Sequence, residues 1–156
     1  MKKIYIIGCP GSGKTCFANF LAKLLDIDVL HLDDIYWDSN WEKRNFEQVT
    51  ADLKGIVHKN MWIIEGCYEE LEDIIIEKAD VVLLLRIGAI TALFRVIRRC
   101  IMGVLRKQKT CGRNRESLKR LFGKNGMIDY TLFQQRRYET YKESDKIKVI
   151  KNGVFK

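Results

Sequence analysis

Short apolar runs alternate with amphipathic segments along this chain. The apolar runs are rich in Ile and Val, which is typical of strands that are buried on both faces of a sheet. They span residues 4–7, 29–32, 62–64, 81–85 and 147–150. The segments between them place apolar residues at helical spacing. These predicted helices cover 14–25, 46–58, 68–78, 89–105 and 115–141, the last with an interruption near 123–126. Because strands alternate with helices, we expect right-handed βαβ units and a parallel sheet covered on both faces.

The length and composition fit one globular unit. The chain has 156 residues, of which 47% are apolar, and it contains one proline and no internal repeat. That size lies within the usual range of a single domain with one core. We therefore expect residues 1–156 to form a single α/β domain.

The strongest motif lies between the first predicted strand and the first predicted helix. Residues 8–15, Gly-Cys-Pro-Gly-Ser-Gly-Lys-Thr, match the phosphate-binding pattern G-x-x-x-x-G-K-[ST] in full. Its glycines allow backbone N–H groups to point at an anion, and the helix that follows directs its positive end to the same place. We expect Lys14 to reach the β- and γ-phosphates of ATP or GTP, and the Thr15 hydroxyl to bind Mg²⁺.

Carboxylates follow two of the predicted strands. Asp33 and Asp34 come after residues 29–32, and Glu65 comes after residues 62–64, whereas the fourth strand ends in Arg86. An acid beside the phosphate loop can hold Mg²⁺, and another can accept the proton of an attacking hydroxyl. A helix cap or a turn is the alternative for each of them. The spacing does not assign the two roles.

The positive charge is concentrated in one segment. The net charge is +8, but residues 95–120 alone carry +9, which leaves the rest of the chain at −1. Arg95, Arg98, Arg99 and Arg106 recur at helical spacing and share one helix face, which we expect to lie opposite an apolar face. That apolar face consists of Leu93, Ile97, Ile101 and Val104.

Three interpretations of this basic segment remain open. It can form a lid that closes over the triphosphate, because guanidinium groups suit the charge of a phosphoryl group in transfer. It can be a solvated basic face, or a surface that binds nucleic-acid backbone with strong salt dependence. No base-reading module accompanies it, so a nucleic-acid partner is less favoured.

The remaining polar and aromatic residues give weaker signals. Tyr36, Trp37 and Trp41 follow the paired aspartates and can line a pocket for an acceptor molecule, with packing as the alternative. Cys9 and Cys67 can approach each other and are interpreted as small spacers. His31 and His58 receive no chemical role.

The cysteine pattern and the lack of a targeting segment indicate the cytoplasm. The five cysteines are odd in number and contain no C-x-x-C pair, so neither a disulfide framework nor a zinc site is expected. The apolar run at 4–7 is too short for a signal peptide, and the run at 81–97 is interrupted by Arg86 and Arg95. We expect a cytoplasmic protein without a membrane partner.

Several further motifs give the chain a family resemblance. They are L-H-L-D at 30–33, W-I-I-E-G-C-Y at 62–68, R-V-I-R-R at 95–99, G-R-N-R-E-S at 112–117 and R-R-Y at 136–138. Together with the phosphate loop, they make the chain resemble adenylate-kinase-like P-loop proteins, and most closely the FlaR-type branch labelled "DNA topology modulation". The chain departs from the family pattern at Glu65 and at Arg86, since the family usually has Asp at the first position and often at the second.

The resemblance implies a fold and a layout of the site. It implies a P-loop NTPase with three α/β/α layers and a five-stranded parallel sheet in the order 2-3-1-4-5. It also implies a short lid at about 106–115, an acceptor-binding segment after the second strand, and a nucleotide base near 151–153.

Two functional hypotheses follow. The first is an Mg-ATP-dependent kinase that acts on an unidentified small molecule, and the second is an ATP-gated regulator that binds DNA or RNA. The kinase is favoured because arginines beside a phosphate loop already have an anion to bind. The expected nucleotide-binding residues are Gly8, Pro10, Gly11, Ser12, Gly13, Lys14, Thr15, Cys16 and Arg113. The expected catalytic residues are Lys14, Asp33, Arg98, Arg99 and Arg115, and the expected metal-binding residues are Thr15, Glu65 and Asp33.

Overall fold

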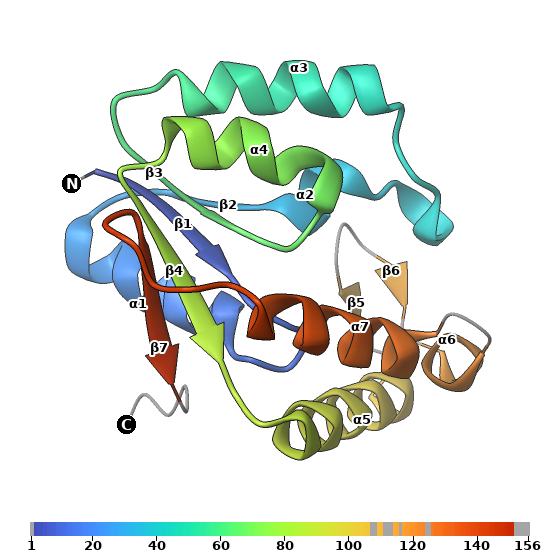
Figure 1. Ribbon diagram of the computed structural model, residues 1–156. Coiled ribbons are helices and arrows are strands. Elements are labelled where there is room, and N and C mark those ends of the chain that lie inside the picture. The colour runs from blue at the N-terminus through green and yellow to red at the C-terminus, as the bar shows by residue number, and fades with distance from the viewer. Residues whose placement is uncertain (1, 107–108, 111–113, 116, 124–125, 152–156) are drawn as a thin grey trace.

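The protein is a three-layer α/β/α unit built on a parallel sheet (Figure 1). A computed structural model describes residues 2–106, 109–110, 114–115, 117–123 and 126–151. The strands of the large sheet are β1 (Lys3–Ile7), β2 (Val29–His31), β3 (Trp62–Glu65), β4 (Val81–Arg86) and β7 (Ile147–Lys151). Their order is β2-β3-β1-β4-β7, and every neighbouring pair is parallel. The predicted order 2-3-1-4-5 is therefore confirmed.

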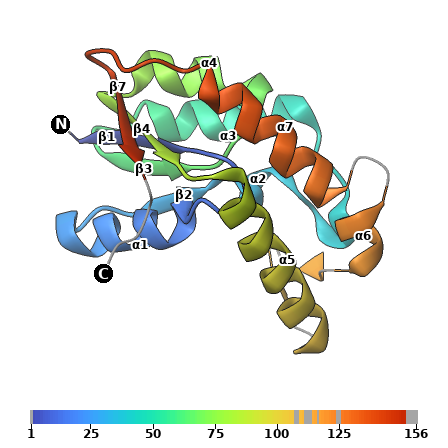
Figure 2. The ribbon, with the colours of Figure 1, turned by 60° about the horizontal axis from the view of Figure 1, so that its bottom comes forward.

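Helices cover both faces of this sheet. The helices are α1 (Lys14–Leu25), α2 (Leu32–Tyr36), α3 (Phe46–Val57), α4 (Glu69–Lys78), α5 (Ala89–Leu105), α6 (Leu118–Phe122) and α7 (Met127–Glu139). A 3-10 turn, η1 (Ser39–Trp41), follows α2, and a short antiparallel pair, β5 (Lys109–Thr110) and β6 (Asn114–Arg115), follows α5. Figure 2 shows α5 extending away from the sheet beside α7.

The alternation of side chains along the strands divides the core into two layers. Tyr5 and Ile7 of β1 face a cluster with α3, α4 and Tyr138 of α7. Ile4 and Ile6 face the opposite cluster, which α1 covers with Phe17 and Ala18. The side chains of residues 4–7 are all buried, as the continuous apolar run predicts.

Most predicted elements are present. The predicted start of a helix at 115 is wrong, since Arg115 lies in β6 and α6 begins at Leu118. Two other differences bear on the site. The second strand ends at His31, so Asp33 and Asp34 lie in the first turn of α2 rather than directly at a strand end. Acidic residues in the first turn of a helix are stabilised by its dipole, which explains why the chain turns helical there. In addition, α5 buries Ala92, Val96, Cys100 and Gly103 instead of the predicted apolar face.

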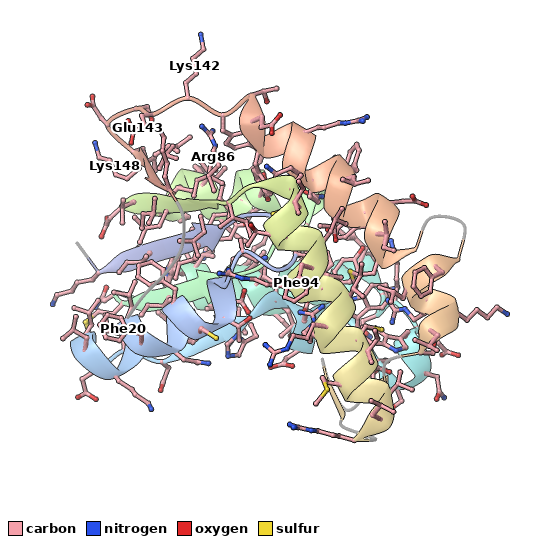
Figure 3. All side chains as sticks on the ribbon, turned by 90° about the horizontal axis from the view of Figure 1, so that it is seen from below. Phe20, Arg86, Phe94, Lys142, Glu143 and Lys148 are labelled. Carbon is pink, nitrogen blue, oxygen red and sulfur yellow. The ribbon has the colours of Figure 1, made fainter. Side chains whose placement is uncertain are left out.

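This second difference has a steric cause. Small residues of α5 let the helix approach the phosphate loop closely, since a side-chain carbon added at Gly11 would lie 2.6 Å from the Ala92 carbonyl oxygen. Larger apolar residues on the helix remain outside, with Ile90 85% and Phe94 66% exposed. Figure 3 views this side of the molecule, with Phe20 on α1 and Phe94 on α5.

Candidate functional site

The phosphate loop connects β1 to α1 in the geometry of an anion cradle. Gly8, Gly11 and Gly13 have φ values of 150°, 80° and 96°, which glycine adopts without strain. Gly13 is the N-cap of α1 and offers no side chain to cap the first turn. The first N–H groups of the helix therefore keep the capacity to bind an anion.

Two further observations in the loop fit a bound phosphate. The Ser12 hydroxyl is buried and has no hydrogen-bond partner among the described residues, although buried hydroxyl groups normally have one. Lys14 Nζ donates to the carbonyl oxygens of Gly8 at 2.9 Å and of Cys9 at 3.2 Å, so the ammonium group lies over the loop. The residues present thus fit the triphosphate of a nucleotide. Pro10 is buried in the same loop, and Cys16 is exposed on the first turn of α1.

Glu65 connects the loop to β3. Its Oε1 accepts a hydrogen bond from the Thr15 hydroxyl at 3.0 Å and another from His31 Nδ1 at 2.8 Å. Burial by itself raises the pKa of this carboxyl group, but the His31 hydrogen bond and the charge of Lys14 lower it below its usual value. The hydrogen bond to Glu65 in turn raises the pKa of His31. Glu65 is therefore kept ionised beside the Thr15 hydroxyl.

This arrangement suits a hard cation that is shared with a nucleotide. Among the described residues, no group of three or more His, Cys, Asp and Glu side chains could hold a metal ion. Mg²⁺ retains several waters and is usually held by one or two protein oxygens together with phosphate oxygens. Thr15 and Glu65 provide protein oxygens of that kind.

Asp33 lies within an aromatic cluster. Its Oδ1 accepts a short hydrogen bond from the Tyr68 hydroxyl, which in turn accepts one from Trp37 Nε1 at 2.8 Å. Burial, followed by the nearby charge of Asp33, raises the pKa of Tyr68, so this phenol stays protonated and donates. Asp33 is thus oriented by a chain of donors from β3–α4 and α2.

The cluster forms a wall next to Asp33. Tyr36 and Tyr68 stack with their ring centroids 4.0 Å apart, and Trp37 meets Tyr36 edge-on at 5.2 Å. Trp41 lies 5.8 Å from Trp37 in a second edge-on contact. The Tyr36 hydroxyl donates to Glu70. The predicted aromatic residues are therefore brought together, along with Tyr68, which the sequence analysis did not single out.

Arg95 of the basic segment (residues 95–120) contacts the phosphate loop. Arg95 Nη1 donates to the Gly11 carbonyl oxygen at 3.3 Å. Arg98 and Arg99 are exposed on α5. Arg113 lies outside the described residues, and Arg115 is described only as part of the β6 backbone. The sequence analysis placed Arg95 on the basic helix face but did not include it among the expected site residues.

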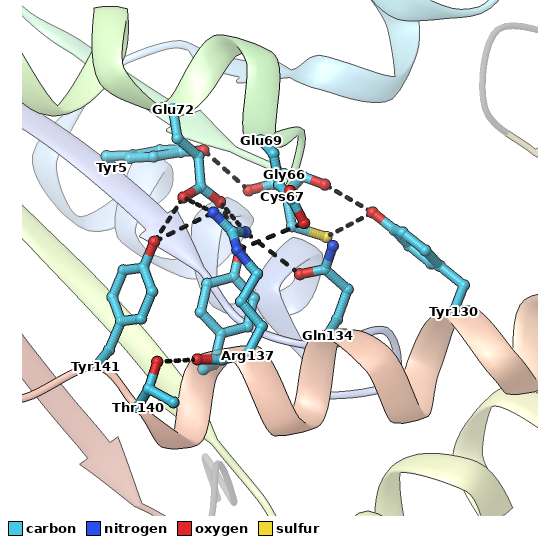
Figure 4. Close-up of polar contacts among 11 residues, drawn as sticks. Tyr5, Gly66, Cys67, Glu69, Glu72, Tyr130, Gln134, Arg137, Thr140 and Tyr141 are labelled. Atoms are coloured by element: carbon cyan, nitrogen blue, oxygen red, sulfur yellow. Dashed lines mark hydrogen bonds and ion pairs between the residues drawn. The ribbon is translucent and has the colours of Figure 1, made fainter.

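A buried polar network fixes α7 over the sheet (Figure 4). Glu72 of α4 is 2% exposed and accepts hydrogen bonds from both terminal nitrogens of Arg137, at 2.9 and 2.7 Å. The hydroxyls of Tyr138 and Tyr141 donate to the same carboxylate at 2.7 and 2.9 Å. This network forms only when α4 packs against α7. The local sequence does not indicate that Glu72 is buried.

Arg86 has a structural role at the end of β4. Its Nη2 donates to the carbonyl oxygens of Tyr138 and Tyr141, both at 2.8 Å, so it satisfies the C-terminal end of α7. Gln135 Nε2 donates to the Ile87 carbonyl oxygen at 2.9 Å. The two hydrogen bonds of Arg86 explain why an arginine stands at the end of this strand.

The comparisons with known proteins give a fold and no family. No protein-family model matches the chain, and no curated protein matches it. Solved structures do match. A putative kinase from Chloroflexus aurantiacus aligns with TM-score 0.57 and 15% identity over 95% of this chain and 86% of that chain.

Two further matches are similar in extent. A gluconokinase from Sinorhizobium meliloti aligns with TM-score 0.55 and 9% identity over 96% of this chain and 82% of that chain. A deoxyadenosine kinase from M. mycoides with bound dATP aligns with TM-score 0.51 and 16% identity over 97% and 92%. The chain therefore has the α/β fold of P-loop kinases. Within the described part of the chain, no helix combines the length and hydrophobicity needed to cross a membrane.

Proposed function

We propose that this protein is a phosphotransferase that uses Mg²⁺-ATP, or GTP, to phosphorylate a hydroxyl group of a small molecule. The observation that carries the proposal is the position of two carboxylates in a P-loop fold. Glu65 is hydrogen-bonded to Thr15 beside the phosphate loop, and Asp33 is held within the aromatic wall. A kinase needs one acid for the metal and another for the acceptor.

The nucleotide side is assigned to the phosphate loop. The backbone N–H groups of residues 11–15 surround the β- and γ-phosphates, and Lys14 leaves its loop carbonyls to bind them. Thr15 and Glu65 would hold Mg²⁺, which would supply positive charge next to the transferred group. Arg95 braces the loop through Gly11, and Arg98, Arg99, Arg113 and Arg115 of the basic segment are assigned to neutralise the charge of the γ-phosphate.

The acceptor side is assigned to Asp33 and its aromatic wall. In the reaction the acceptor oxygen forms a bond to the γ-phosphorus, and the bond between that phosphorus and the β–γ bridging oxygen breaks. Asp33 takes the hydroxyl proton, and ADP leaves with the bridging oxygen. The rings of Trp37, Trp41 and Tyr68 favour an acceptor with an apolar or planar face next to its hydroxyl.

The rival function is a nucleotide-gated regulator that binds nucleic acid through the basic segment. Exposed Arg98 and Arg99 are available for it. The contact from Arg95 to the phosphate loop favours the kinase, because it connects the basic segment to the nucleotide site.

The deciding experiment is an acceptor panel. Purified protein is incubated with γ-labelled ATP, Mg²⁺ and nucleosides, nucleotides, sugars, sugar acids and small alcohols, and labelled products are separated. We expect one class to be labelled, with the rate lost in Lys14→Ala and Asp33→Asn. Slow hydrolysis alone across the panel, together with DNA or RNA binding that weakens steeply with salt, would replace the kinase by its rival.

A further inference from the structure

The loop that carries Trp41 adopts a conformation that its own sequence does not favour. Asn40 and Trp41 both have φ of 61°, in the left-handed region. Asparagine tolerates this region, but a bulky residue there requires support from its surroundings. The loop is closed by a bridge between Trp37 and Lys43 and by a hydrogen bond from Asp38 N to the Glu42 carbonyl oxygen at 2.8 Å.

The support comes from Asn114, 73 residues later in the chain. Its Oδ1 accepts the Trp41 backbone N–H at 2.8 Å, and its Nδ2 donates to the Asp38 carbonyl oxygen at 2.9 Å. Asn114 is 2% exposed. The oxygen and the nitrogen of the buried Asn114 amide therefore hold the backbone at both ends of the η1 turn.

Arg120 of α6 holds the side chain of the same residue. Its guanidinium carbon lies 3.4 Å from the centroid of the Trp41 ring and 5.8 Å from that of Trp37. Guanidinium groups stack favourably on indole rings. Trp41 is thus fixed at its backbone by β6 and at its ring by α6.

Both supports follow α5, which itself touches the phosphate loop. Arg95 of α5 donates to the Gly11 carbonyl oxygen, and the backbone of Ala92 in the same helix lies close to Gly11. Contacts therefore run from the phosphate loop to α5, from Cys100 of α5 to the Ser117 carbonyl oxygen before α6 at 3.7 Å, and from Arg120 of α6 to Trp41 in the loop at residues 36–44. Such a set can carry a coupling energy between two ligands when one of its members has two arrangements. Trp41 is the residue of this set that is held in a disfavoured conformation.

We propose that Asn114 and Arg120 are positioning residues that latch the acceptor-side loop 36–44 to β6 and α6, so that nucleotide and acceptor strengthen each other's binding. The inference rests on the proposed function. With nucleotide bound, the latch is closed and Trp41 completes the acceptor wall. When the latch opens, Trp41 relaxes out of the left-handed region and the wall is incomplete.

The test measures the state of the loop without needing the acceptor. Hydrogen exchange of amides 37–43 and tryptophan emission are recorded with and without Mg²⁺ and a non-hydrolysable ATP analogue. In the wild type we expect the analogue to slow exchange at these amides about 5-fold or more and to change the emission, with the change absent in Trp41→Phe.

Three variants separate the latch from general stability. Asn114→Ala and Arg120→Lys are expected to bind the analogue within about 3-fold of wild type, but to lose its effect on amides 37–43. Lys119→Ala, which removes an exposed charge next to Arg120 on the same helix, is expected to keep the effect.

Each outcome is informative. If the wild type binds no nucleotide, the proposed function fails. If nucleotide binds and amides 37–43 do not respond, or if they respond equally in wild type, Asn114→Ala and Arg120→Lys, then the latch is wrong while the kinase stands.

Discussion

Glu65 Oε1 lies 3.0 Å from the Thr15 hydroxyl, although the two residues are 50 positions apart. The contact joins the end of β3 to the first turn of α1 across neighbouring parallel strands. It places a buried carboxylate beside the hydroxyl of the phosphate loop, and its consequences can be measured directly.

Replacing Glu65 by Gln removes the charge and keeps an oxygen for Thr15. Loss of a charged metal contact or of its supporting partner typically costs 10- to 100-fold in metal affinity. We expect the Mg²⁺ concentration for half-maximal ATP binding to rise by about 10-fold or more in calorimetric titrations. Glu47→Gln, at an exposed position on α3, is the control and should match wild type. An unchanged Mg²⁺ requirement in Glu65→Gln would remove Glu65 from the metal site.

The ion pair between His31 and Glu65 predicts a pH-dependent stability. The pKa of His31 is raised above 6.5, so its contribution is complete below about pH 6.5 and is lost as the pH rises through the folded-state value. The pKa of Glu65 is lowered below 4.5, so its contribution is complete above about pH 4.5 and is lost as the pH falls through its folded-state value.

The stabilising effect of the pair should therefore be greatest between about pH 4.5 and 6.5. Thermal melting of wild type and His31→Gln without nucleotide checks this, and the difference in Tm should shrink toward pH 8.5. A Tm difference that grows with pH would contradict the assigned direction.

Gly11 allows α5 to approach the phosphate loop. An added side-chain carbon would meet the Ala92 carbonyl oxygen at 2.6 Å, at a φ of 80° that other residues rarely adopt. Gly11→Ala should lower the free energy of unfolding by about 1–3 kcal/mol and weaken ATP binding. Gly55→Ala, in the open interior of α3, should instead raise it by about 0.5–1 kcal/mol. Urea unfolding measures both, and equal effects would contradict the close approach.

Arg137 compensates the buried charge of Glu72. Removing one partner of a buried ion pair leaves the other uncompensated, which costs about 3–5 kcal/mol. We expect Arg137→Ala to lower the free energy of unfolding by that amount in urea. Arg136→Ala, at the exposed neighbouring position, should change it by less than about 0.5 kcal/mol. A small effect of Arg137→Ala would mean that the Tyr138 and Tyr141 hydroxyls suffice to stabilise the carboxylate.

The sequence alone determined the fold and the phosphate loop, because both depend on local chemistry. Apolar runs of Ile and Val specify buried parallel strands, and residues 8–15 carry their own backbone geometry wherever a strand precedes them and a helix follows. Helix 14–25 was predicted with the bounds that it has, since glycine ends the loop and the apolar spacing begins at once.

Only the tertiary structure decided which side chains meet. The contact of Glu65 with Thr15 and His31 depends on the register of neighbouring strands, and the support of Trp41 by Asn114 depends on the packing of segments 73 residues apart. The helix face that α5 buries was likewise set by the close approach at Gly11, which favours small residues over the larger apolar residues that the spacing indicated. Local periodicity contains no information about such contacts, because they form only when distant parts of the chain pack together.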